Sequence, residues 1–271
     1  MRELHVKEIK GYVIDLDGTV YTGQSAIEGS IDAVKELQQQ GIPFVFLSNR
    51  GNYSRAMCKA KLEKMGLNVR EDQIILSSTV TAKYLLGEDK DAPIWPLGDP
   101  GLKQELQSFG LRIAERPEEA RWLVITLHET LTYQELNMAF RAVRHGARII
   151  ATNADRMFPG DDGDCIDVAS MIGAIVHSTG QEVELVMGKP SLRMAEAALE
   201  VLQLPPDQCV VIGDSLASDV QLGINSGMRT AIVLTGSITR EDVMSSDLKP
   251  DWVVDDLLSF VQKLAVEELA E

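Results

Sequence analysis

The sequence is short of cysteine, of long apolar runs and of positive charge, and each shortage excludes a class of protein. Its three cysteines, Cys58, Cys165 and Cys209, are far apart and odd in number, which predicts reduced thiols rather than a disulfide framework or a cysteine metal site. The longest apolar runs, such as 44–47, fall well short of a membrane span, and residues 1–10 alternate in charge without the apolar stretch of a signal peptide. We therefore expect a cytoplasmic protein that has no membrane partner.

The charge balance points away from polyanionic partners. The chain has 26 Lys and Arg against 41 Asp and Glu, which gives a formal net charge of -15 at pH 7. Such a chain repels nucleic acid, so we expect no nucleic-acid partner, and an anionic substrate must be held by local positive groups. With 45% hydrophobic and 25% charged residues, the composition is that of a globular protein that buries a sizeable core.

Short apolar runs alternate with amphipathic stretches, a pattern typical of parallel βαβ units. The first group of predicted elements comprises strands at 11–14, 43–47 and 74–76 and helices at 27–40 and 54–65. A separate group follows, with strands at 94–97, 122–126 and 148–151 and a helix at 133–144. From residue 184 the pattern of the first group resumes, with predicted strands at 185–187, 209–212, 230–234 and 252–254. We predict an α/β core of residues 1–77 and 184–271, interrupted by an inserted α/β domain at 78–183. Within the insertion, the acidic cluster of Asp161, Asp162 and Asp164 is interpreted as a loop that forms a solvated turn.

Two acidic residues, Asp15 and Asp17, follow the first apolar strand. Residues two apart in an extended chain share a face, and two adjacent carboxylates require a cation, a shared proton or both. The alternative is a simple turn, because Asp and Gly are common turn residues. Their position favours a functional role, since open α/β sheets bind ligands at the carboxyl ends of their strands.

Two further strands are followed by groups suited to phosphate. Ser48, Asn49 and Arg50 offer a hydroxyl, an amide and backbone N–H groups at a helix entry, although a helix N-cap is the commoner explanation of such a segment taken by itself. Lys189 follows the strand at 185–187. A lone lysine there is usually a solvated charge. About 4 Å from a phosphoryl dianion, however, its electrostatic attraction would contribute on the order of 4 kcal/mol at an effective dielectric of 20.

A fourth strand is followed by Asp214, with Asp219 one helical turn further on. Both carboxylates can reach the same point, and carboxylates with water are the ligands that Mg²⁺ prefers. A helix cap would explain one of these residues but not both. We expect all four strand ends to meet at one edge of one sheet.

These segments, DLDGTV, SNRGN, GKPS and GDSLASD, resemble the four motifs of the haloacid dehalogenase superfamily, and the resemblance covers essentially the full chain. The insertion, with TNADRMFP inside it, is similar to the type IIA α/β cap of the NagD-like subfamily. SNRGNYSRAMC, LHETLTY and IDVASMIGAI resemble the AraL-type sugar phosphatases most. The resemblance implies a doubly wound, Rossmann-like parallel-sheet core, a small phosphorylated metabolite as substrate, Mg²⁺ as cofactor and, as in many relatives, a homodimer.

The resemblance also implies a role for each matching residue. Asp15 matches the nucleophile and Asp17 the general acid and base. The phosphate-binding positions are Ser48, Asn49, Arg50 and Lys189. The magnesium positions are Asp15, the main-chain carbonyl of Asp17, Asp214 and, as a supporting acid, Asp219.

Two departures from the family pattern leave the substrate open. Many relatives carry Pro-Gly-x-Gly-Ala where this chain has 166–170, and many carry Asp in place of His128. We expect sugar phosphates, with broad specificity, and nucleoside monophosphates or phosphoglycolate are the alternative substrates. The alternatives of other classes are a phosphomutase and a catalytically silent regulator that binds a phosphorylated metabolite. His128, Asn153 and Asp155 are the cap residues we expect to contact substrate, with local turn and capping bonds as the alternative.

Overall fold

The computed structural model describes residues 9–160 and 163–269. The predictions made for residues 1–8 and for Asp161 and Asp162 therefore lie outside the described residues. Asp164, predicted in the same loop, lies instead in a strand, Gly163–Ile166, that pairs antiparallel with Met157–Gly160. The chain forms two compact units. The first contains the described residues up to Ser48, Lys59–Ile75 and the residues from Met194 onward; the second contains Asn49–Cys58 and Leu76–Arg193. Among the described helices, none combines the length and apolar composition that a bilayer crossing requires.

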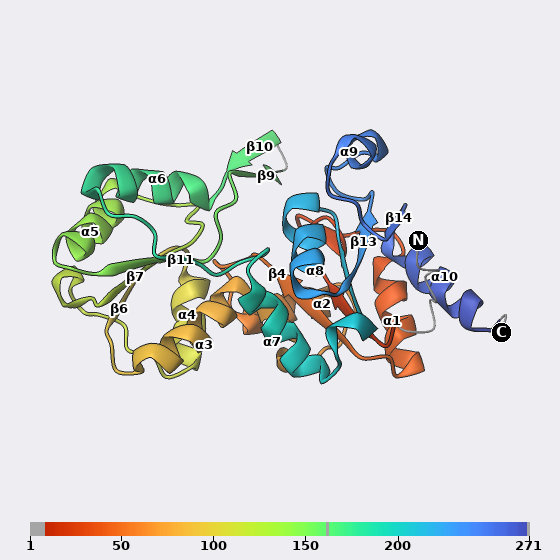
Figure 1. Cartoon of the computed structure of the whole chain (residues 1–271). Coiled ribbons are helices and arrows are strands. Elements are labelled where there is room, and N and C mark those ends of the chain that lie inside the picture. The colour runs from red at the N-terminus through yellow and green to blue at the C-terminus, as the bar shows by residue number, and fades with distance from the viewer. Residues whose placement is uncertain (1–8, 161–162, 270–271) are drawn as a thin grey trace. The chain divides into compact units, whose positions relative to one another are not determined.

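The first unit is built on a six-stranded sheet with the order β14-β13-β12-β1-β4-β5 (Figure 1). The strands are β1 (Gly11–Ile14), β4 (Phe44–Ser48), β5 (Ile74–Leu76), β12 (Cys209–Gly213), β13 (Arg229–Val233) and β14 (Trp252–Val254). β1 pairs in parallel with both β4 and β12. The chain builds the sheet outward from β1 in one direction and then, from β12, in the other, so the topological switch point lies between β1 and β12. This arrangement confirms the predicted doubly wound α/β core.

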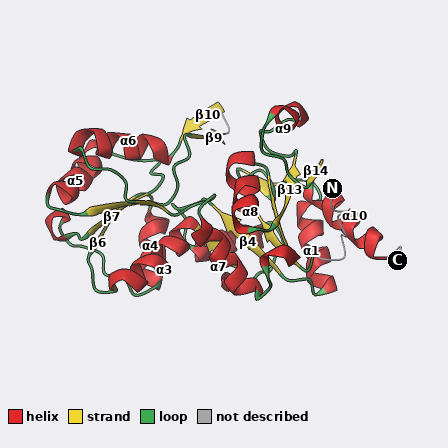
Figure 2. Cartoon of the chain, viewed as in Figure 1, coloured by secondary structure: helices red, strands yellow, loops and turns green. Residues whose placement is uncertain are grey.

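Helices cover this sheet, whose central strands are buried along their whole length (Figure 2). Every residue of β1, β4 and β12 is buried. Helix α1 (Ser30–Gln40) buries Ala33, Val34 and Leu37 and ends at Gly41, whose φ of 69° is the left-handed conformation that glycine accepts readily. The other α-helices that lie wholly or mostly in this unit are α2 (Arg55–Lys64), α7 (Leu192–Leu202), α8 (Gln221–Ser226), α9 (Arg240–Ser245) and α10 (Leu257–Leu269).

The second unit contains a four-stranded sheet with the order β11-β8-β7-β6. The strands are β6 (Ile94–Leu97), β7 (Trp122–Ile125), β8 (Arg148–Ala151) and β11 (Leu185–Val186), and a hairpin joins β9 (Met157–Gly160) to β10 (Gly163–Ile166). Alternate residues of β7 face two separate cores. Leu123 and Ile125 pack with helices α5 (Tyr133–Arg144) and α6 (Val168–Thr179), while Trp122 and Val124 pack with α3 (Ser77–Asp89) and α4 (Pro100–Ser108).

The strand before Lys189 belongs to this second sheet, which corrects the expectation that all four motif strands share one sheet edge. Leu185 pairs with Ile150 and Val186 with Ala151 of β8. A run of three apolar residues predicts a strand but carries no information about its partner, and here β8 is the neighbour that the chain reaches after α6. The predicted insertion, 78–183, lies within the second unit, and its limits as a domain stay a prediction.

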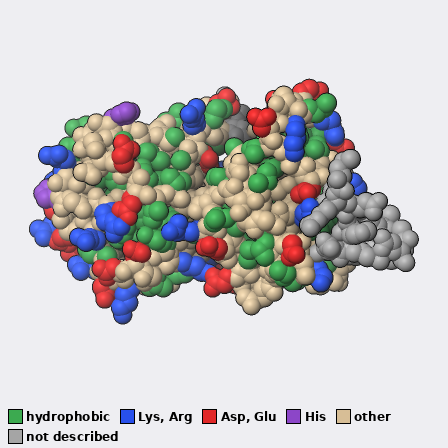
Figure 3. Space-filling view, in the orientation of Figure 1, with side chains coloured by type: hydrophobic (Ala, Val, Ile, Leu, Met, Phe, Trp, Pro, Cys, Tyr) green, Lys and Arg blue, Asp and Glu red, His purple; other side chains and the backbone are tan. Residues whose placement is uncertain are grey.

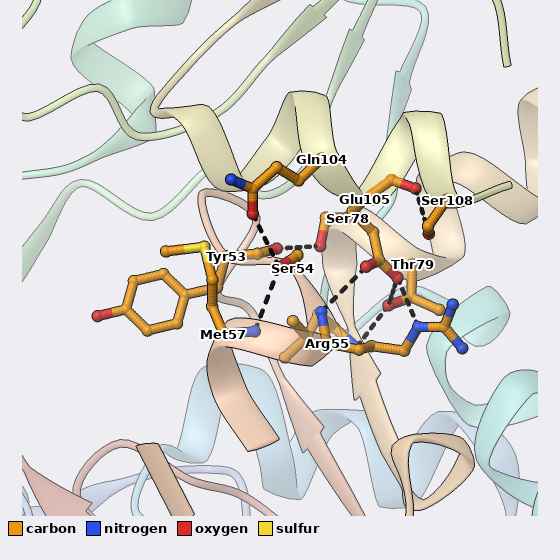
Figure 4. A network of polar contacts seen from close by, with 10 residues as sticks. Tyr53, Ser54, Arg55, Met57, Ser78, Thr79, Gln104, Glu105 and Ser108 are labelled. Carbon is orange, nitrogen blue, oxygen red and sulfur yellow. Dashed lines mark hydrogen bonds and ion pairs between the residues drawn. The ribbon is translucent and has the colours of Figure 1, made fainter. Parts of the chain in front are cut away.

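The segment that follows β4 is anchored in the second unit by a buried polar network (Figure 4). Glu105 of α4 is 1% exposed and accepts hydrogen bonds from Arg55 Nε at 2.6 Å, Arg55 N at 3.0 Å and Thr79 Oγ1 at 2.9 Å. Ser78 Oγ donates to the carbonyl of Tyr53 at 2.8 Å. These bonds explain why Asn49–Cys58 groups with the second unit although the preceding strand belongs to the first.

Candidate active site

Three carboxylates converge at the switch point of the first unit. Asp15, Asp214 and Asp219 each offer an oxygen, and the three oxygens lie within 4.8 Å of one another. Asp15 follows β1 and Asp214 follows the neighbouring β12, and Asp15 N donates to Ile212 O at 2.8 Å. Asp15 is 7% exposed and Asp219 only 1%. Burying like charges together is costly unless a cation compensates them, so this set has the composition of a metal site.

Glycine backbone encloses these carboxylates. A Cβ carbon added at Gly236 would lie 1.8 Å from Asp214 Oδ2, and one at Gly18 would lie 2.3 Å from the same oxygen. A Cβ at Gly213 would lie 2.2 Å from Asp219 Oδ2. Asp219 Oδ2 in turn accepts a hydrogen bond from Ser215 N at 3.1 Å. A fixed set of carboxylate oxygens fits a small, hard divalent cation such as Mg²⁺, which favours oxygen ligands and near-octahedral geometry.

Asp17 stands outside this group of three carboxylates. Its Oδ2 accepts a hydrogen bond from Tyr21 Oη at 3.4 Å, and the chain turns back beside it, with Gly18 N donating to Tyr21 O at 2.8 Å. Lys61 Nζ lies 3.5 Å from the centroid of the buried Tyr21 ring. Thr235 Oγ1 donates to Gly18 O at 2.6 Å. The turn that carries Asp17 is therefore held by a tyrosine and a threonine that the sequence interpretation did not include.

A second group of predicted site residues meets within the second unit. The Asn49 side chain accepts a hydrogen bond from Lys189 N at 2.7 Å and donates to Asp155 Oδ2 at 3.0 Å. Asn153 Nδ2 donates to Asp155 Oδ2 and to Asn49 O, both at 3.1 Å. Asn153 and Asp155 follow β8 and Lys189 follows β11, so the pairing of these two strands brings them together. Lys189 is 6% exposed, which excludes the solvated lysine considered from the sequence.

The remaining predicted residues have other surroundings. The Arg50 guanidinium lies 5.6 Å from the ring centroids of both Tyr53 and Phe158. Ser48 ends β4 in the first unit and is 2% exposed. Ser48 is thus a buried strand residue and Arg50 a half-buried one, and their predicted contact with phosphate stays a prediction.

His128 is held by two acidic side chains of the second unit. Its Nδ1 lies 3.3 Å from Asp99 Oδ1 and its Nε2 lies 3.3 Å from Glu135 Oε1. The pKa of Glu135 is lowered, first by hydrogen bonds from Thr132 and to a smaller degree by His128. Thr132 and Glu135 form the capping box that begins α5. His128 is 7% exposed and its Nδ1 neither accepts nor donates a hydrogen bond among the described residues, so its predicted contact with substrate stays a prediction.

The sequence interpretation missed Tyr21, Thr235 and Gly236. A signal for the last two was present, because Thr235 and Gly236 follow the apolar strand β13 just as the predicted motifs follow theirs. Tyr21 gave no comparable signal, since it is recognised only by the turn that brings it back to Asp17. On the face seen in Figure 3, basic side chains are interspersed with acidic ones, in keeping with an anionic ligand bound by buried groups rather than by a basic surface.

Comparison with known proteins gives matches along nearly the whole chain. The family described as haloacid dehalogenase-like hydrolase matches residues 12–112, and a second, HAD-hydrolase-like family matches residues 186–260. The sugar-phosphatase AraL of Bacillus subtilis (strain 168) is 51% identical, over 95% of this chain and 93% of its own length. The 5'-nucleotidase YutF of the same strain is 32% identical, over 94% and 99%. The solved p-nitrophenyl phosphatase from Archaeoglobus fulgidus has a TM-score of 0.88 and 36% identity, over 94% of this chain and 99% of that one.

Proposed function

The chain belongs to the NagD-like group of the haloacid dehalogenase-like hydrolases and is a phosphatase, and we propose that it hydrolyses sugar phosphates through a phosphorylated Asp15. The observation that carries this proposal is the convergence of Asp15, Asp214 and Asp219 at the switch point of the sheet. The uncatalysed hydrolysis of phosphate monoesters is so slow that enzymes accelerate it by up to ~10²¹-fold. A buried acidic group built for a cation meets the main requirement, which is to compensate charge around the reacting phosphorus.

We assign the magnesium ligands as the carboxylates of Asp15 and Asp214 and the main-chain carbonyl of Asp17, with Asp219 as a supporting acid. When bound there, Mg²⁺ would neutralise charge on the phosphoryl oxygens and on the carboxylates themselves. Asp219 supports the proposal because its Oδ2 also accepts the Ser215 N–H, which fixes the turn that carries Asp214.

The reaction proceeds in two displacements. An oxygen of Asp15 attacks phosphorus and the phosphorus–oxygen bond of the ester breaks, while Asp17 gives its proton to the leaving oxygen. Asp17 then takes a proton from water, the water oxygen attacks phosphorus, and the bond to Asp15 breaks to release inorganic phosphate. Such proton transfers typically contribute ~10²- to 10⁴-fold. We assign to Lys189, with Ser48, Asn49 and Arg50, the binding of phosphoryl oxygens.

The substrate class rests on the relatives. A sugar phosphatase at 51% identity favours a sugar phosphate, and a 5'-nucleotidase at 32% identity makes a nucleoside monophosphate the second candidate. Phosphoglycolate is the third candidate substrate. His128, Asn153 and Asp155 were predicted to contact substrate, and among them only Asp155 is more than slightly exposed. A cytoplasmic location and a homodimer stay predictions.

The test is a panel of phosphate esters, comprising pentose and hexose phosphates, nucleoside monophosphates, phosphoglycolate and p-nitrophenyl phosphate, assayed with Mg²⁺ and with a chelator. We expect Mg²⁺-dependent release of phosphate that is highest on sugar phosphates, and its loss in Asp15→Asn. Asp251→Asn provides the control, because Asp251 precedes β14 at the amino ends of the strands. Activity that survives in Asp15→Asn would rule out the nucleophile, and a wild-type protein inactive on the whole panel would favour the silent regulator.

A further inference from the structure

The backbone at Gly188 and Lys189 lies unusually close to the residues that follow β8. Met187 N donates to Ala151 O at 2.9 Å, which continues the pairing of β11 with β8 past its last residue. A Cβ carbon at Gly188 would lie 2.6 Å from Asn49 Oδ1 and 2.6 Å from Thr152 O. Glycine is therefore required here by close approach, and the chain before Lys189 is packed directly against the Asn49 amide.

The side-chain amide of Asn49 contacts both the N–H and the carbonyl of Lys189. Asn49 Oδ1 accepts from Lys189 N at 2.7 Å, and Asn49 Nδ2 faces Lys189 O at 3.4 Å. An amide can be turned over, which would exchange its oxygen and nitrogen and place a donor against the Lys189 N–H. The orientation of the Asn49 side chain therefore decides whether it holds the Lys189 backbone or repels it.

Asp155 sets that orientation. An ionised carboxylate only accepts hydrogen bonds, so Asp155 Oδ2, 3.0 Å from Asn49 Nδ2, requires the nitrogen to face it and leaves Oδ1 for Lys189. Asn153 Nδ2, 3.1 Å from the same carboxylate oxygen, anchors Asp155 from the other side and also donates to Asn49 O. Asn153 is 4% exposed, so this support is shielded from water.

We propose that Asp155 is a positioning residue, which acts through the Asn49 amide to hold the Lys189 backbone and so fixes the conformation from which the lysine acts in the proposed reaction. The inference rests on the proposed function, because it takes over the role given there to Lys189. It differs from the prediction that Asp155 contacts the substrate, and the two make different kinetic predictions. A substrate contact would depend on the leaving group, whereas positioning of Lys189 affects every phosphate ester equally.

The kinetic test compares Asp155→Ala, Asp155→Asn, Lys189→Met and the double variants on a sugar phosphate and on p-nitrophenyl phosphate. We expect Asp155→Ala to lower kcat by about 10- to 100-fold on both substrates, the loss typical of a hydrogen bond to a charged group. Asp155→Asn keeps an acceptor for Asn49 Nδ2 and should restore kcat to within about 5-fold of wild type. In the Lys189→Met background, Asp155→Ala should change kcat by less than about 2-fold, because two residues acting through one contact are not additive.

Hydrogen exchange of the Lys189 amide provides a readout that does not need turnover. Its N–H donates to Asn49 Oδ1, so we expect faster exchange in Asp155→Ala and protection close to wild type in Asp155→Asn. Asp251→Ala is the matched control, since it also removes a half-buried carboxylate that accepts hydrogen bonds, here from Thr230 N, Thr230 Oγ1 and Arg229 Nη1, and should leave both kcat and this amide unchanged.

Three results would overturn the inference. They are a loss confined to the sugar phosphate, full additivity of Asp155→Ala with Lys189→Met, and unchanged exchange of the Lys189 amide in Asp155→Ala. A wild-type protein without phosphatase activity would instead overturn the proposed function, and the exchange experiment would still decide whether Asp155 holds the Lys189 backbone.

Discussion

Asp214 and Gly236 approach each other so closely that a side chain at position 236 would occupy the place of the Asp214 carboxylate. The added Cβ would lie 1.8 Å from Asp214 Oδ2. A Cβ added at Gly18, in another loop, would lie 2.3 Å from the same oxygen. The direction of this carboxylate is therefore set by backbone rather than by flexible side chains. Rigid backbone of this kind is what a metal with strict geometric demands requires.

Gly236→Ala should displace Asp214 and weaken Mg²⁺ binding. We expect the Mg²⁺ concentration for half-maximal activity to rise by about 10-fold or more, in the range seen when residues that orient metal ligands are changed. Gly87→Ala is the control, because a Cβ at Gly87 in α3 would meet nothing within 4 Å. A Gly236→Ala protein with an unchanged Mg²⁺ requirement would contradict the assignment of Asp214 as a ligand.

Mg²⁺ should stabilise the folded protein, because it binds a site that the unfolded chain lacks. At a concentration 100 times the dissociation constant the gain is about 2.7 kcal/mol, and thermal unfolding with and without a chelator measures it. In the chelator, Asp219→Asn should unfold at a higher temperature than wild type, since it removes one of three like charges and keeps an acceptor for Ser215 N. A melting temperature that does not respond to Mg²⁺ in the wild-type protein would count against the metal site.

Glu105→Ala should destabilise the second unit. It leaves Arg55, whose side chain is 22% exposed, without the carboxylate that accepts from both its backbone and its guanidinium. We expect a loss of about 2 to 3 kcal/mol, below the value for a fully buried pair because water reaches part of Arg55. The control is Asp72→Ala, which breaks an Arg–carboxylate pair with side chains 70% and 62% exposed and should change thermal unfolding little. Equal effects of the two substitutions would refute the stabilising role of the network.

Cys209 should make stability depend on pH in the alkaline range. Burial, with a smaller effect of Asp207, raises the pKa of its thiol from 9.0 to about 11. The folded chain therefore keeps a proton that the unfolded chain releases, so this contribution to stability is complete below pH 9 and is lost as the pH rises towards 11. Its size is about 3 kcal/mol. Urea unfolding of wild type and Cys209→Ala between these pH values should show a steeper loss of stability in wild type, and parallel curves would contradict the prediction.

The secondary structure followed from the sequence where apolar runs are bounded by polar residues or glycine. β1, β6, β8 and β14 and helix α5 have the predicted limits. Helix α1 begins at Ser30 rather than at residue 27, because Gly29 has a φ of 76° and Ser30 Oγ donates to Val20 O at 2.7 Å. These contacts come from the fold around the helix and have no local signature.

The pairing of strands was less predictable than their existence. The strand at Leu185–Val186 was expected in the first sheet and lies in the second, because partner choice depends on how the whole chain packs. The hairpins β2 (Tyr21–Thr22) with β3 (Ser25–Ala26) and β9 with β10 were not predicted either. Their strands are short, and those whose side chains are described are largely exposed, so they lack the apolar alternation by which strands are recognised.

The acidic group of the first unit could be predicted from the sequence, whereas the hydrogen bonds among the site residues of the second unit could not. The acidic residues Asp15, Asp214 and Asp219 could be grouped because each follows a strand of one parallel sheet. The bond from Asn49 to Asp155 joins residues 106 positions apart and depends on hydrogen-bond direction, which a sequence does not encode locally.

The pairing of Ile14 with Ile212 has a consequence for biosynthesis. On the ribosome, β1 is made early but has no β12 beside it until most of the chain has emerged, and contacts of such long range are formed late and slowly. Until then the inner edge of β1 offers unpaired backbone groups to any other nascent chain. We expect translation-arrested fragments that stop before residue 209 to need chaperones, and the ability to bind metal to arise only once Asp214 and Asp219 have been made.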